Sequence, residues 1–182
     1  FDLGKTQSIL VASNYLSQQR SRHLASFSLS PLPGTAREGK AIAKLTNANL
    51  LMQEQATALA VQEQAAPKVL HLASHAYFQA DPEDNNENPL LRSGIVLAGA
   101  NQPNANPQDD GYLTALEVAK LDWQGTEMVV VSGCESGKGE IQAGEGVYGL
   151  KRAIAVAGAR SSMISLWTVS YTQLTLTTKA KE

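Results

Sequence analysis

Cysteine is scarce in this chain of 182 residues, because only Cys134 is present. A single cysteine excludes a disulfide framework within the chain and is typical of a reducing compartment, so we expect a cytoplasmic location. Long apolar runs are missing as well, since none approaches the ~18 residues that a membrane-spanning helix needs. We also find no secretory signal peptide. The sequence therefore predicts no membrane partner.

An excess of basic charge is also absent. The 15 Lys and Arg residues are outnumbered by 17 Asp and Glu residues, and no basic stripe is visible, so we expect no nucleic-acid partner. Hydrophobic residues make up 43% of the chain and charged residues 18%, which is enough apolar material for one core and argues against disorder. Because the first residue is Phe1 rather than Met, we expect a fragment of a longer protein.

Apolar segments alternate with helical patterns along the chain. Strands are predicted over residues 7–13, 48–52, 69–74, 93–100, 127–132 and 161–167. Helices are predicted over residues 38–45, 56–65 and 114–121 and within 144–159. Capping boxes are expected at Thr35 with Glu38 and at Thr114 with Glu117. Several of the strands are continuous apolar runs, which indicates a parallel sheet covered by helices on both faces.

The single cysteine and a histidine follow two of these strands. Cys134 comes just after the strand at 127–132, and His75 just after the strand at 69–74. Because ligands bind outside the carboxyl ends of the strands in open α/β sheets, we expect both side chains at one edge of the sheet. An imidazole close to a thiol favours the thiolate, which is the nucleophile in cysteine catalysis.

Structural interpretations of the same residues stay open. A lone cysteine is most often a small buried apolar residue, although the glycine-rich turn after Cys134 is an unusual place for one. His75 can be a satisfied polar group at a strand end. His71 shares a strand face with Val69 and Ala73, so we expect it to be structural and hydrogen-bonded. A zinc site of His71, His75 and Cys134 would lack a fourth ligand, so no metal is expected.

Other candidate motifs are weaker. The letters GEGVYG at 144–149 match G-x-G-x-x-G, but the segment does not follow a strand directly, so we interpret the match as chance and expect no cofactor. Glu135 and Glu145 are candidates for lining a substrate pocket, with solvated side chains as the alternative. Arg92 and Arg160 are interpreted as surface cations rather than pocket residues.

Five segments together resemble a known family. They are LPGT (32–35), VLHLASHAYF (69–78), NPLLRSGIVLAGAN (88–101), DGYLTALEVAKLDWQGTEMVVVSGCESGKGE (110–140) and GEGVYGLKRAIAVAGARSSMISLWTV (144–169). This pattern is similar to the CHAT domain, a caspase-like peptidase domain of the caspase and separase clan that is found with tetratricopeptide repeats in cyanobacteria and other bacteria. We expect one such domain over residues 1–169, incomplete at both ends.

The resemblance implies a fold and a mechanism. The fold is a caspase-like three-layer α/β/α sandwich with a mostly parallel central sheet. The activity is that of a regulatory cysteine endopeptidase with a Cys–His dyad, in which Cys134 is the nucleophile and His75 the base. Backbone N–H groups near Ala76 and Gly133 would hold the oxyanion. The implied partners are a protein or peptide substrate and an N-terminal tetratricopeptide-repeat region.

Three features depart from the family pattern. The family usually has glycine after the dyad histidine, where this chain has Ala76, whose β-carbon could crowd the oxyanion hole or force an unfavourable φ. It usually has Ser-Ala-Cys-Glu-Thr-Gly, where this chain has Gly133 before Cys134 and Ser136 after Glu135. Residues 170–182 do not match and are expected to be an artefactual tail.

A catalytically inactive interaction module and a small-molecule cysteine hydrolase or acyltransferase are the alternative functions.

Overall fold

The computed structural model describes residues 32–78, 89–101, 106, 108–133 and 145–165. Several sequence predictions fall outside these residues, namely the strand at 7–13, the roles of His23, Cys134 and Glu135, and the tail at 170–182. The backbone of Glu145 is described, but its side chain is not.

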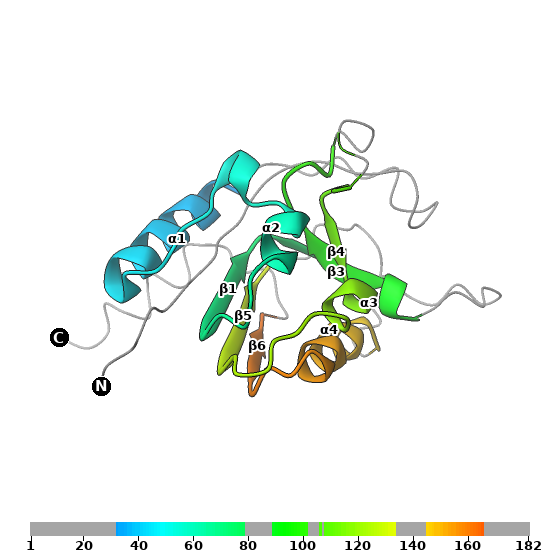
Figure 1. The fold of residues 1–182 in the computed structure, drawn as a ribbon. Helices are drawn as coiled ribbons and strands as arrows, with labels where there is room; N and C mark the ends of the chain where they lie inside the picture. The colour runs from blue at the N-terminus through cyan, green and yellow to red at the C-terminus, as the bar shows by residue number, and fades with distance from the viewer. Residues whose placement is uncertain (1–31, 79–88, 102–105, 107, 134–144, 166–182) are drawn as a thin grey trace, which may run out of the picture.

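A parallel sheet forms the centre of the fold. Its strands are β1 (Val69–Ala73), β5 (Met128–Ser132) and β6 (Ser162–Ile164), arranged in the order β1-β5-β6 (Figure 1). Both neighbouring pairs are parallel. Apolar runs predicted all three strands, and the fold is α/β with a mostly parallel sheet, as the sequence led us to expect.

Helices cover this sheet on two sides. The helix α1 (Pro33–Thr46) packs on the face of β1 that carries His71, whereas α4 (Glu145–Val156) lies on the other side of the sheet (Figure 1). There, Leu150 and Ile154 of α4 share one core with Leu70 of β1 and other buried residues. The shorter helices are α2 (Ala58–Gln62) and α3 (Ala115–Val118), and two single 3₁₀ turns span Gln53–Gln55 (η2) and Pro89–Leu91 (η3).

A second, antiparallel sheet was not anticipated. It contains β2 (His75–Phe78), β3 (Ser93–Val96) and β4 (Tyr112–Thr114), in that order. The sequence predicted the segment 93–100 as a further strand of the parallel sheet, and this is wrong in direction, because β3 pairs antiparallel with both neighbours. Only Ser74 separates β1 from β2, so no turn residue marks where the chain leaves one sheet for the other.

Two further local predictions were wrong. Residues 48–52 form no strand, and Leu50 and Met52 instead pack against Ala73. The capping box at Thr35 does not form either, because α1 begins earlier, at Pro33, and its cap at Leu32 has no side-chain hydrogen bond. The Thr35 hydroxyl donates to the Leu32 carbonyl at 2.8 Å. Proline suits the first helical position, where its missing N–H has no helical partner to lose.

The second predicted capping box is confirmed. Thr114 is fully buried, and its Oγ1 accepts from the Glu117 N–H at 3.2 Å and donates to Glu117 Oε2 at 2.7 Å. The same carboxylate oxygen accepts from the Thr114 N–H at 2.9 Å. This reciprocal pair satisfies two backbone donors at the start of α3, just where β4 ends.

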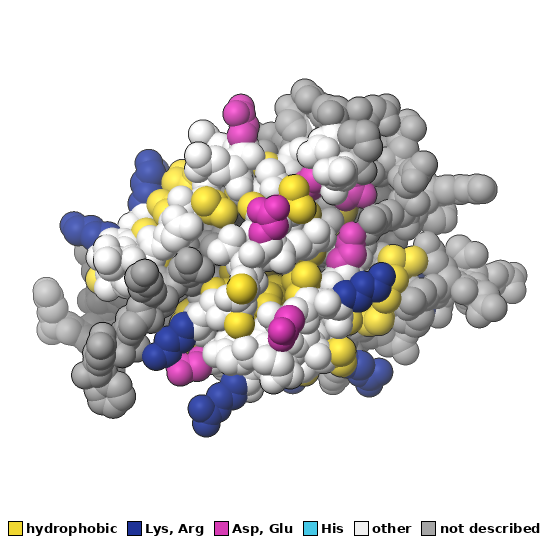
Figure 2. All heavy atoms as spheres, viewed as in Figure 1, with side chains coloured by type: hydrophobic (Ala, Val, Ile, Leu, Met, Phe, Trp, Pro, Cys, Tyr) yellow, Lys and Arg dark blue, Asp and Glu magenta, His cyan; other side chains and the backbone are white. Residues whose placement is uncertain are grey.

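The surface of the described residues carries mixed charge. On the face drawn in Figure 2, Lys and Arg side chains are spread around the outline and acidic side chains lie between them, rather than one sign gathering into a patch. Among the described helices, none has both the length and the apolar character needed to cross a bilayer.

Replacing Thr114 by alanine tests the capping box. We expect Thr114→Ala to lower the free energy of unfolding by about 1–2 kcal/mol, because the cap is lost and the Glu117 carboxylate loses its hydroxyl partner. The matched control is Thr46→Ala, whose hydroxyl bonds the Ile42 carbonyl at an exposed site and should matter by less than about 0.5 kcal/mol. Urea denaturation followed by circular dichroism measures both, and equal losses would contradict the assignment.

Candidate functional site

Ser74 ties together the two sheets directly before His75. Its N–H donates to the Ser132 carbonyl of β5 at 3.1 Å, and its hydroxyl donates to the Val96 carbonyl of β3. Ser74 is 1% exposed and His75 is 4% exposed. The backbone that presents His75 is therefore fixed from both sheets at once, in the interior of the molecule.

The end of β5 lies beside the end of β1. In the parallel pairing, Ala73 stands opposite Ser132, so the two strands stop at the same level and at the same edge of the sheet. The residue after β5 is Gly133, which is buried and directly precedes Cys134 in the sequence. The predicted placement of both strand ends at one edge is confirmed for the backbone up to Gly133.

Gly133 is held by a serine that follows β6. Its N–H donates to Ser165 Oγ at 3.1 Å, and the Ser165 hydroxyl donates back to the Gly133 carbonyl at 2.8 Å. The Ser165 N–H also donates to the Val131 carbonyl at 3.0 Å. Hydrogen bonds between β5 and the residue that follows β6 thus fix the position just before the cysteine.

Gly133 lies next to the residues on either side of His75, with no room for a side chain between them. A β-carbon built on Gly133 would lie 2.8 Å from the Ser74 carbonyl oxygen, 3.1 Å from the Ala76 β-carbon and 3.3 Å from the Ala76 nitrogen. The position before Cys134 and the position after His75 are therefore adjacent. These two positions, Gly133 and Ala76, are the ones predicted from the sequence to lie at the oxyanion site. The distance between the His75 ring and the Cys134 sulfur stays a prediction, because Cys134 lies outside the described residues.

The backbone at Ala76 is not strained. The described non-glycine residues with positive φ are Asn47, Gln53 and Ala66. The expectation that a β-carbon after the histidine might force an unfavourable φ is therefore wrong. Ala76 is 3% exposed, and its methyl group occupies the space that Gly133 leaves open.

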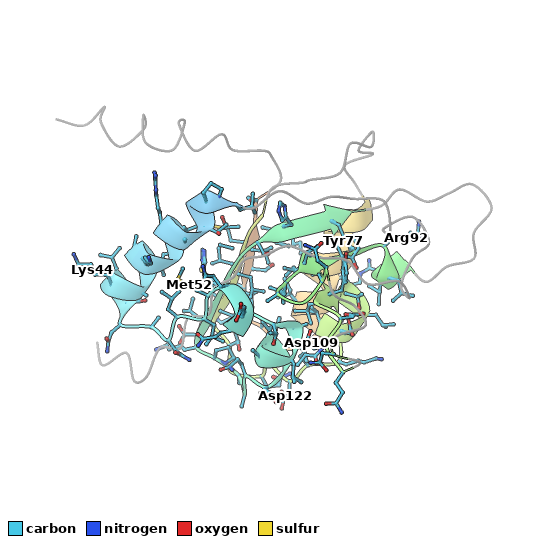
Figure 3. All side chains as sticks on the ribbon, turned by 90° about the horizontal axis from the view of Figure 1, so that it is seen from above. Lys44, Met52, Tyr77, Arg92, Asp109 and Asp122 are labelled. Atoms are coloured by element: carbon cyan, nitrogen blue, oxygen red, sulfur yellow. The ribbon has the colours of Figure 1, made fainter. Side chains whose placement is uncertain are left out.

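Two tyrosines share a sheet face with His75, and no sequence motif singled them out. Cross-strand register places His75, Val96 and Tyr112 in one row, with Tyr77 two residues along β2. The two phenol rings meet edge to face with centroids 5.9 Å apart, and Tyr77 lies on the same side of the molecule as Arg92 (Figure 3). Only the antiparallel sheet brings these side chains to the site, and that sheet was missed.

Tyr112 contributes a neutral hydroxyl to this row. Burial raises the pKa of Tyr112 well above its usual range, and the nearby Tyr77 and Asp110 raise it further. Tyr112 is 2% exposed, so its phenol is neutral at physiological pH. It can donate a hydrogen bond but cannot act as a base.

The other residues considered in the sequence analysis, His71, Arg92 and Arg160, differ in burial and in hydrogen bonding. The prediction that His71 is structural is supported, because its Nε2 lies 2.8 Å from Glu38 Oε1 and links β1 to α1. No group of three or more His, Cys, Asp or Glu residues that could hold a metal occurs within the described ranges. Arg160 is exposed, as expected. Arg92, in contrast, is 7% exposed, so its interpretation as a surface cation is wrong.

Comparison with known proteins shows the family of this chain. The family model described as the CHAT domain matches residues 3–177, which is nearly the whole chain. The matched range includes all the motifs named above, from LPGT to SLWTV. No curated protein matches the chain.

Exchanging the contacting pair tests the packing at this site. Gly133→Ala would place a methyl group within 3.0 Å of backbone, so we expect it to lower the free energy of unfolding by about 1–3 kcal/mol. Adding Ala76→Gly removes one of the clashing groups, so the double variant should recover at least about 0.5 kcal/mol relative to the sum of the single changes.

The control pairs Gly133→Ala with Ala153→Gly, a change at a buried position of α4 that should add without coupling. Urea denaturation of all five variants completes the two cycles. Strict additivity of the first pair would show that these two residues do not share one space.

Proposed function

Since the chain belongs to the CHAT domain family, which has a caspase-like fold related to cysteine peptidases, we propose that it is a cysteine endopeptidase with Cys134 as nucleophile and His75 as base. The observation that carries this proposal is the close approach of Gly133 to Ser74 and Ala76. The residue before the cysteine lies beside the two residues that flank the histidine, which supports a pair whose side chains must come within hydrogen-bond reach.

The proposed reaction has two halves. His75 takes the proton of the Cys134 thiol, and the thiolate sulfur bonds to the carbonyl carbon of a peptide while the π electrons of that carbonyl move to its oxygen. As the carbonyl re-forms, the carbon–nitrogen bond breaks and the amine leaves with the proton from the His75 imidazolium. Water then attacks the thioester, His75 accepts its proton, and the acid departs from the sulfur.

Backbone N–H groups are the proposed stabilisers of the oxyanion. The candidates are the N–H of Cys134 and one near Ala76, whose nitrogen lies 3.3 Å from the β-carbon position built on Gly133. Glu135 and Glu145 are proposed to line the substrate pocket and to attract a basic side chain. Both follow the contact region in the sequence, one directly after the cysteine and one at the start of α4.

The biological setting we propose is regulatory proteolysis in the cytoplasm. The family association with tetratricopeptide repeats suggests that such a region precedes this domain and presents a protein substrate to it. The alternative is a catalytically inactive interaction module. Ala76 favours that alternative, because its methyl group stands beside the proposed oxyanion site, where the family usually has glycine.

Covalent labelling tests the proposal. We expect a peptidyl acyloxymethyl ketone to modify Cys134 and to leave Cys134→Ala unmodified. His75→Ala should slow the modification by about 100-fold or more, because the thiolate loses its base. His23→Ala, which removes a histidine predicted to be on the surface, is the matched control and should label at the original rate. Intact-protein mass spectrometry measures each rate.

A peptide library, read by mass spectrometry, then identifies the class of reaction. Cleavage by the unaltered chain but not by Cys134→Ala supports an endopeptidase. Hydrolysis of small esters without any peptide cleavage would replace it by the small-molecule hydrolase. Absence of both would favour the interaction module.

A further inference from the structure

The hydroxyl of Ser165 bonds both backbone groups of one residue, Gly133. It accepts from the Gly133 N–H at 3.1 Å and donates to the Gly133 carbonyl at 2.8 Å. These two atoms flank the Cα of Gly133, so one side chain determines the orientation of both peptide planes that meet there. Gly133 is buried and Ser165 is half-buried, which limits the access of water that could replace the hydroxyl.

The carbonyl of Gly133 belongs to the peptide unit that it shares with Cys134. A peptide unit between non-proline residues is planar and almost always trans, so we expect the N–H of the next residue to point opposite to this carbonyl. A hydrogen bond that fixes the carbonyl therefore fixes the direction of the following N–H. Donation to the carbonyl also polarises the peptide and strengthens that N–H as a donor.

We propose that Ser165 is a positioning residue for the oxyanion site, acting through the Gly133–Cys134 peptide unit on the N–H that would receive the developing negative charge. This inference rests on the proposed role of Cys134 as the nucleophile. Ser165 would not touch the substrate. It holds the donor in place before the reaction, so little reorganisation is needed as the charge develops.

A second serine, Ser161, also links β5 and β6 through a hydrogen bond to a backbone carbonyl, and its role is structural. The Ser161 hydroxyl donates to the Glu127 carbonyl at 2.5 Å, joining the starts of β6 and β5. Ser165 joins their ends. Both serines link the same two strands through a backbone carbonyl, but Ser161 lies at the opposite end of the sheet from His75 and Gly133. Ser161→Ala is therefore the matched control for Ser165→Ala.

Two reagents separate an effect on the oxyanion from an effect on the thiol. p-Nitrophenyl acetate acylates the thiolate, with p-nitrophenolate as leaving group, through a tetrahedral oxyanion. Iodoacetamide alkylates the same sulfur by displacing iodide and forms no oxyanion. The ratio of the two rate constants at Cys134, measured on the full 182-residue chain with Cys134→Ala as the blank, reports the oxyanion site alone.

We expect Ser165→Ala to slow acylation by about 10- to 100-fold while alkylation changes less than about twofold. Ser161→Ala should leave both rates as they are. If Ser165→Ala fails to fold, the pair Ser165→Thr and Ser165→Val replaces it, because the two side chains have nearly the same shape and only threonine keeps the hydroxyl. The threonine variant should then acylate faster by the same factor.

Each outcome decides between the explanations. A parallel fall in acylation and alkylation would place the effect on the thiol and overturn the inference, as would an unchanged acylation rate or no acylation of Cys134 in the unaltered chain. Acylation that depends on Ser165 in a chain that never cleaves peptides would uphold the inference and overturn the endopeptidase. The two proposals can therefore fail separately.

Discussion

The parallel pairing of β1 with β5 is the constraint on which the rest of the site depends. Parallel neighbours point their carboxyl ends the same way, and the register that sets Ala73 opposite Ser132 makes both strands end at one level. A slip of one residue would turn every side chain of a strand to the other face, and buried Leu70, Val129 and Val131 oppose such a slip. The hydrophobic core thus sets the position from which His75 and the chain beyond Gly133 leave the sheet.

Much of this could be predicted from the sequence, and the failures share a cause. Apolar runs located β1, β5 and β6, because the residues that pair these strands and fill the core leave that signal in the strands themselves; β1 is nearly all buried, whereas Met163 of β6 is 59% exposed. The antiparallel sheet was missed because β2 and β4 are short, and the change of sheet occurs at Ser74 through hydrogen bonds to distant carbonyls. Ser165 was missed for the same reason, since its partner lies 32 residues away.

Glu38 shows how a local signal can be outweighed by tertiary structure. Its spacing from Thr35 suited a capping box, but the carboxylate bonds His71 on β1 and the helix begins at Pro33 instead. The two departures from the family pattern at the site show a related effect. Ala76 and Gly133 looked independent in the sequence, yet the two positions are adjacent in the structure. This chain has alanine after the histidine and glycine before the cysteine, whereas the family pattern has glycine and alanine at these positions, so either arrangement places one methyl group in the shared space. Relative to the family pattern, the methyl group lies on the side of the histidine, at Ala76, instead of on the side of the cysteine, at position 133.

The bond between Ser165 and Gly133 has a consequence for how the protein is made. Translation proceeds from the N-terminus, and domains generally fold as their segments emerge from the ribosome. Residues 74 to 133 can leave the ribosome and still lack the hydroxyl that holds Gly133, which arrives only with residue 165. A partly synthesised chain therefore carries its thiol without the finished setting around it. For a protease, that order of events would delay activity until nearly the whole domain has been translated.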